Sequence, residues 1–158
     1  MKFLLFITYL FANLSAPSES IIHTNVVGEL RLDNFQNEVF LEAILDKRYL
    51  TVALKNEGDC TPSEMLTVCG SKYFMEHTNV AVNETEVAPV QQSVEVQRDF
   101  VVFRYSLGDQ GEVNQVTLQS DYMTEYFDHS EINVSVDIYE LSRTYRITEK
   151  RSSVTINL

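Results

Sequence analysis

Alternation of apolar and polar residues is the main pattern along this chain, and residues 132–139 show it most regularly. Asn133, Ser135 and Asp137 fall on one face of that segment, opposite Ile132, Val134, Val136 and Ile138. A period of two residues is typical of a strand with one buried face. We therefore predict a strand here whose apolar set faces a core.

Residues 100–107 carry a second such pattern, with Val101, Phe103, Tyr105 and Leu107 on one face. The other face changes from apolar to polar along its length: Phe100, Val102, Arg104, Ser106. Because 112–119 also alternates and Gly108 and Gly111 bracket the connection, we predict a hairpin. Its second strand would bring Val116 and Leu118 against the first.

Several shorter segments read as further strands. A polar turn at 149–153 separates 145–148 from 154–156, which predicts a second hairpin. The remaining expected strands are 21–32, 49–55, 73–75, 80–82 and 94–96.

Residues 35–46 are compatible with a strand or with a helix beginning at Asp33 or Asn34. A period of two separates the apolar residues of 38–45 better than a helical period does, and this favours the strand. The whole pattern predicts an all-β fold. We expect an antiparallel β-sandwich, or a partly closed barrel, of roughly eight to ten short strands with at most one short helical turn.

The N-terminus has the order of a secretory signal: Lys2, an apolar run over 3–12, and small residues over 15–20. We expect residues 1–18 to be removed, with the boundary between 16 and 20. Residues 19–158 then form one exported domain, long enough to bury a core. No later run is long and apolar enough for an ordinary membrane span.

The chain of 158 residues has a formal net charge of −11. Such an acidic protein repels phosphate backbones, so nucleic acid is a poor partner and a basic protein surface is favoured. Cys60 and Cys69 are the two cysteines, and in an oxidising compartment they predict one short disulfide loop. Asn83-Glu84-Thr85 and Asn133-Val134-Ser135 are sequons, which predict N-glycosylation of Asn83 and Asn133.

The loop 120–129 places aromatic residues among acids. A short helical turn capped by Ser120 would put residues four apart on one side. Two interpretations remain open: a patch that contacts a protein partner, or a lid over the β core. The residues concerned are Tyr122, Met123, Tyr126 and Phe127.

We find no catalytic, metal-binding or phosphate-binding motif in the sequence, and we expect neither enzymatic activity nor a cofactor. The expected function is that of a secreted, non-enzymatic protein that binds an extracellular protein through loops or a sheet face. Two alternatives stay open. One is a carrier of a small apolar ligand within the β domain, and the other is a structural component of an extracellular coat or matrix.

Overall fold

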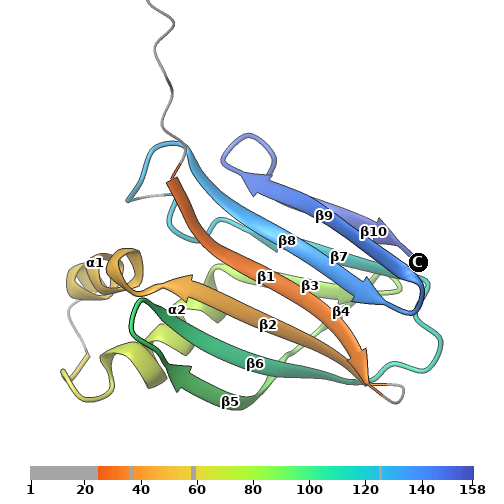
Figure 1. Cartoon of the computed structure of the whole chain (residues 1–158), viewed down its shortest axis with the longest axis horizontal. Helices are drawn as coiled ribbons and strands as arrows, with labels where there is room; N and C mark the ends of the chain where they lie inside the picture. Colours follow the sequence, from red (N-terminus) through yellow and green to blue (C-terminus); the bar gives the residue numbers. More distant parts are fainter. Residues whose placement is uncertain (1–24, 36–37, 58–59, 125) are drawn as a thin grey trace, which may run out of the picture.

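Two β-sheets packed face to face make up the fold, as Figure 1 shows for the computed structural model of the chain. The structure describes residues 25–35, 38–57, 60–124 and 126–158. The predicted signal segment and its cleavage boundary therefore lie outside the described residues. The sandwich expected from the sequence is confirmed in outline, and the two sheets remain separate instead of closing into a barrel.

The larger sheet, sheet A, has six strands in the order β5-β6-β2-β1-β8-β9. Most neighbours are antiparallel, but β1 and β8 run parallel, so this sheet is mixed and the expectation of a purely antiparallel fold is wrong. The strand predicted over 38–45 is confirmed as β2. The bounds are β1 (Asn25–Phe35), β2 (Glu38–Asp46), β5 (Val90–Val96), β6 (Phe100–Asp109), β8 (Ser130–Ile138) and β9 (Leu141–Thr148).

The smaller sheet, sheet B, has four strands in the order β10-β7-β3-β4, and all its pairs are antiparallel. Its strands are β3 (Thr78–Val82), β4 (Thr85–Val87), β7 (Gln115–Ser120) and β10 (Ser153–Asn157).

Between the layers lies one apolar core. Alternate residues of seven strands contribute to it: β1, β2, β3, β6, β7, β8 and β10. The face assignment of β8 is confirmed, because its four apolar residues are at most 2 % exposed while Asp137 is exposed. The predicted inner face of β6 is buried in the same way.

Residues 47–57 form a helix, so the strand predicted over 49–55 is wrong. The helix α1 (Lys47–Glu57) buries Leu50, Ala53 and Leu54, which are three and four residues apart and share one helical face. The side chain of Asp46 accepts a hydrogen bond from the backbone N–H of Arg48 at 2.8 Å, as an N-cap does. The alternation of Leu50, Val52 and Leu54 also fits a strand, in which all three side chains would lie on one buried face. In the helix Leu50 and Leu54 are buried, and Val52 lies exposed.

A second helical segment replaces the strand predicted over 73–75. It consists of a π-helical turn, η1 (Met65–Cys69), followed by α2 (Gly70–Glu76). Together with α1 it exceeds the single helical turn expected from the sequence. A disulfide joins Cys60 to Cys69, the last residue of η1, and so closes the loop that contains this turn.

The start of α2 packs tightly on β6. A Cβ atom on Gly70 would lie 3.1 Å from both Leu50 Cδ2 and Phe103 Cζ, so only glycine fits without displacing these side chains. At the next residue, the buried hydroxyls of Ser71 and Tyr105 lie 3.0 Å apart and form a hydrogen bond. The rings of Phe74 and Tyr105 stack with their centroids 5.9 Å apart.

Both predicted hairpins are wrong, because each connection crosses from one sheet to the other. Strand β6 belongs to sheet A and β7 to sheet B, so Val116 and Leu118 face the β6 residues across the core instead of beside them. Strands β9 and β10 are divided between the sheets in the same way. Alternation is the same in either layer, and it therefore cannot reveal which strands pair.

The burial of β8 predicts unequal effects of two substitutions on this strand. Val134→Asp should lower the free energy of unfolding by about 3 kcal/mol or more, because it buries an unpaired charge. Asp137→Asn, on the exposed face, should change it by less than about 0.5 kcal/mol. Chemical denaturation of both variants measures the difference, and equal effects would contradict the face assignment.

Candidate functional site

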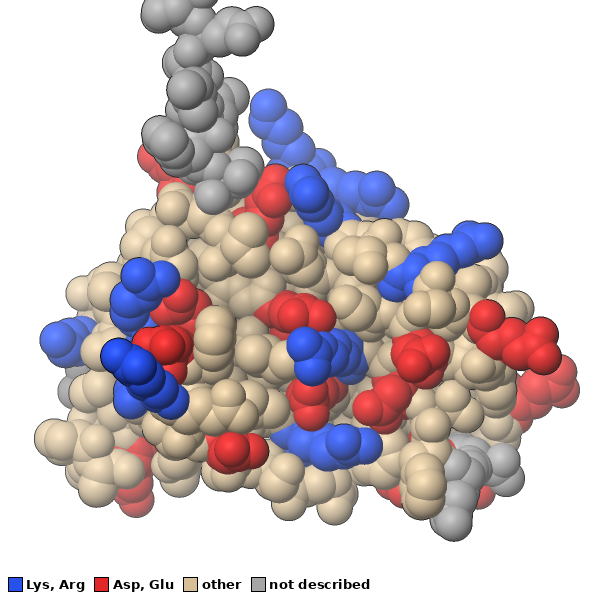
Figure 2. All heavy atoms as spheres, viewed as in Figure 1, with Lys and Arg blue, Asp and Glu red and all other residues tan. Residues whose placement is uncertain are grey.

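The outer face of sheet A is built from the residues that alternate with the core residues. The strand registers place them in rows that run across the sheet. One row contains Arg104, Glu42, Arg31 and Ser135, and the next contains Glu95, Val102, Ile44, Glu29 and Asn133. Figure 2 shows basic and acidic side chains interleaved over this face.

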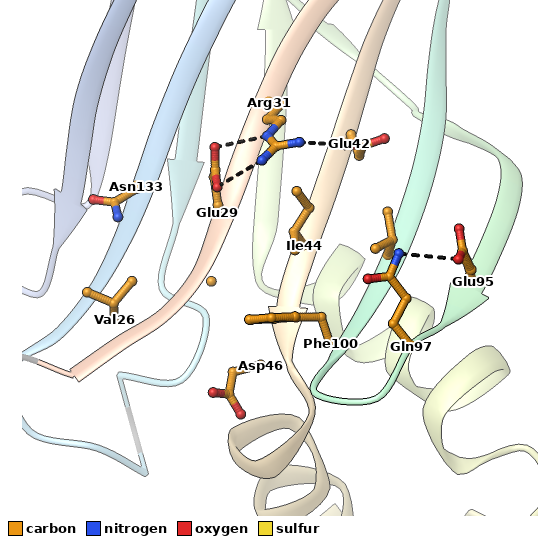
Figure 3. A pocket seen from close by; sticks show the side chains of 12 residues that line it. Val26, Glu29, Arg31, Glu42, Ile44, Asp46, Glu95, Gln97, Phe100 and Asn133 are labelled. Carbon is orange, nitrogen blue, oxygen red and sulfur yellow. Dashed lines mark hydrogen bonds and ion pairs between the residues drawn. The ribbon is translucent and has the colours of Figure 1, made fainter.

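A groove of about 480 Å³ lies on this face, at the end of the sheet near α1. Its floor is apolar: Ile44 and Val102 are half-buried, while Val26 is 47 % and Phe100 43 % exposed. Figure 3 shows this apolar band between a charged group around Arg31 and the carboxylate of Asp46. Exposed apolar side chains gathered beside charged ones are typical of binding sites on otherwise polar surfaces.

Arg31 binds two of the groove's carboxylates. Its guanidinium donates to both oxygens of Glu29, at 2.9 and 3.3 Å, and lies 3.6 Å from Glu42. The hydrogen bond from Arg31, helped by one from the Ser135 hydroxyl at 3.0 Å, lowers the pKa of Glu29 against the opposing effect of burial. Glu29 is thus held in its charged form and in a fixed orientation.

Asp46 combines a structural role with a place in the groove. It accepts hydrogen bonds from the side chain and the backbone N–H of Arg48, and the side-chain bond is the main reason why its pKa is lowered. Glu95, in contrast, accepts a hydrogen bond from the neutral amide of Gln97 at 3.2 Å. Because an amide does not neutralise a carboxylate, the negative charge of Glu95 is the one most available to a cationic ligand.

This arrangement can recognise a ligand of mixed character. An apolar floor edged by four carboxylates and one guanidinium can receive a segment that carries both apolar and basic side chains. Among the described residues, no group of three or more His, Cys, Asp or Glu side chains is placed to hold a metal ion.

The sequence contained a partial signal for this groove. The apolar end of the outer face of β6, Phe100 and Val102, forms part of the floor. Val26, Ile44 and the four carboxylates were missed, because they come from other strands and only the strand registers bring them together.

The two sequons lie in different settings. Asn83 occupies a turn between β3 and β4 with φ +48°, and its amide binds the connection between β6 and β7. It accepts from the backbone N–H groups of Asn114 and Gln115 and donates to the carbonyl of Glu112. Asn133 lies on the outer face of β8 and lines the groove. Glycosylation of either residue remains a prediction.

The loop 120–129 is in large part a lid over the core. Tyr122 is 1 % and Met123 0 % exposed, so the prediction that they contact a partner is wrong. Both side chains lie in the core, where the Tyr122 ring contacts those of Tyr73 and Phe74. The hydroxyl of Ser120 accepts the N–H of Tyr122, as expected of a cap, but the loop forms turns in place of a helix.

Tyr126 and Phe127, the other two candidate binding residues of this loop, are half-buried. Tyr126 lies 6.5 Å from the ring of Tyr73, and Phe127 packs edge-on against Tyr49 with centroids 4.7 Å apart. A role for Tyr126 and Phe127 in binding a partner stays a prediction.

An Asp–His pair that the sequence did not suggest joins α2 to this loop. His77 Nδ1 lies 2.9 Å from Asp121 Oδ1. The neighbouring hydroxyl of Ser120 donates to the carbonyl of His77 and shares a hydrogen bond with Thr78. Through these contacts His77, Asp121 and Ser120 hold the loop 120–129 against the end of α2.

Comparison with protein-family models gives no match, and comparison with curated proteins gives none either. The class of this protein is therefore described by its own structure, a two-sheet sandwich with one mixed sheet and a helical segment. In the part of the chain that the structure describes, no helix is both long and apolar enough to cross a membrane.

The lowered pKa values predict how stability depends on pH. Stabilisation by Glu29 and Asp46 is complete above their ordinary values of 4.5 and 3.8, and is lost as pH falls through the lower folded-state values. We expect the contribution of these two ion pairs to the free energy of unfolding to be constant between about pH 7 and 5 and to fall below about pH 4. In Arg48→Gln the fall should be smaller, because Asp46 loses its partner. Denaturation at a series of pH values measures this, and an unchanged profile in the variant would contradict it.

The buried Tyr122 predicts opposite effects of two substitutions. Tyr122→Ala should lower the free energy of unfolding by about 3–5 kcal/mol, because it leaves a cavity. The Tyr122 hydroxyl has no hydrogen-bond partner among the described residues, and burial raises its pKa well above the ordinary value. Tyr122→Phe should therefore raise stability by about 1 kcal/mol. Thermal melts measure both, and a destabilised Phe variant would show that the hydroxyl is bonded.

Proposed function

We propose that this is a secreted, non-enzymatic protein that binds a basic segment of an extracellular protein in the groove on the outer face of sheet A. The observation that carries the proposal is the apolar floor of Val26, Ile44 and Phe100 set among carboxylates. A segment with alternating basic and apolar side chains would place its apolar groups on this floor and its charges on the rim.

Charge supports a basic partner in two ways. The groove has four carboxylates and one guanidinium among its lining residues, and the chain as a whole has a net charge of −11. Long-range attraction would speed the encounter with a basic surface, and the charges near the groove would orient it. Glu95 provides the contact for an arginine or lysine, since its hydrogen-bond partner is neutral.

The packing of the core favours this surface over the interior as the binding site. Side chains from both sheets and from the helical segment form one buried cluster between the layers. A carrier of a small apolar ligand would need that space for its ligand.

The proposal is tested with a synthetic peptide of alternating arginine and leucine and with protein produced without glycans. Glu95→Lys should raise the dissociation constant about tenfold, because it places a like charge against the peptide's cations. Fluorescence anisotropy at low salt measures the affinity. Binding should also weaken as salt is raised, since exposed charges are screened.

Glu86→Lys is the matched control. Glu86 is exposed on β4 in the other sheet, so its substitution changes the net charge equally but leaves the groove intact. We expect the control to bind as the wild type does. Equal losses in the two variants would mean that the peptide senses only overall charge, and the groove would no longer be the proposed site.

A further inference from the structure

We infer that an N-linked glycan on Asn133 covers the groove and controls the access of the basic partner, an inference that rests on the proposed function. Asn133 begins a sequon, and its side chain lines the groove. In the closed form the groove is therefore filled by a glycan that is attached to this chain itself.

The strand registers show how the glycan would reach the floor. Asn133 is the partner of Glu29 on β1, and Glu29 is the partner of Ile44 on β2. Adjacent strands lie about 4.8 Å apart, so the attachment point is about 10 Å from Ile44, measured across the sheet. A bulky oligosaccharide attached at this edge lies over the carboxylates that the partner would contact.

The amide of Asn133 is available for this modification. Within the described residues its side chain makes no hydrogen bond, although it is half-buried. The Asn83 amide makes three, and these hold the connection between β6 and β7. A glycan at Asn133 therefore displaces no internal contact of the fold.

The oligosaccharide must be transferred to Asn133 before sheet A folds, because β8 is paired on both sides in the folded protein, with β1 and β9. Asn133 Nδ2 forms a bond to the anomeric carbon of an oligosaccharide carried on a lipid diphosphate. The bond between that carbon and the diphosphate oxygen breaks, the lipid diphosphate leaves, and Nδ2 loses one proton. The secretory pathway that the sequence predicts supplies this donor.

The experiment uses the full chain secreted from a eukaryotic cell that glycosylates its exported proteins. Mass spectrometry of peptides should show an oligosaccharide on Asn133. Asn133→Gln removes the sequon but keeps an amide, and it should bind the arginine–leucine peptide more tightly than the glycosylated wild type. A groove that is open one tenth of the time has an apparent affinity about tenfold lower.

Thr85→Ala is the control for loss of a glycan. Thr85, on β4, completes the sequon that begins at Asn83, so its substitution removes that sequon without changing Asn83. It should bind as the wild type does. Thermal melts of both variants verify that they fold.

Two results would overturn the inference alone: Asn133 without a glycan in the secreted protein, or equal binding by the wild type and Asn133→Gln. Failure of Asn133→Gln to bind the peptide at all would overturn the proposed function together with its control by the glycan.

Discussion

Covering the inner face of sheet A is the constraint on which the rest of this structure depends. Six strands present a wider apolar surface than the four strands of sheet B can cover. The helical segment completes the second layer, and it does so by close contact: Gly70 lets α2 approach Phe103, and Phe74 stacks on Tyr105. Burial raises the pKa of Tyr105 to about 12, so its hydroxyl stays protonated and can donate to Ser71. The disulfide then limits the freedom of the loop that contains η1.

The same alternation that fills the core determines the character of the outer face. Once Ala43 and Leu45 point inward, Glu42, Ile44 and Asp46 must point outward, where β1 and β6 add their own outward residues. Asp46 connects the two aspects of the fold, because one carboxylate caps α1 and also closes one end of the groove. The groove is thus a consequence of where β2 ends and the helix begins.

Connections between the sheets make the molecule one unit. The chain passes from one sheet to the other after β2, β4, β6, β7 and β9. Side chains hold the crossing after β6 and the lid, which forms the crossing after β7. Asn83 binds three backbone groups at the crossing from β6 to β7, and Tyr122 and Met123 anchor the loop 120–129 in the core. These residues lie in turns and loops, yet their principal contacts stabilise the fold. An aromatic residue in an acidic loop is therefore weak grounds for a binding site until its burial is known.

The sequence by itself determined the β-rich class, the inward faces of β8 and β6 and the pairing of the two cysteines, and it favoured a strand over a helix at β2. Each of these depends on a local period or on a unique pair, so neighbouring residues carry the information. Tertiary structure decided the rest. It selected a helix at 47–57, where period two competed with a helical stripe, and it buried Tyr122 and Met123. It also separated β6 from β7 and placed β1 beside β8. The groove belongs to this second group, because its residues come from β1, β2, β5, β6 and β8 and from the residues beside them. The physical reason is that pairing energy depends on which strands meet, and a strand's own alternation is the same whichever partner it has.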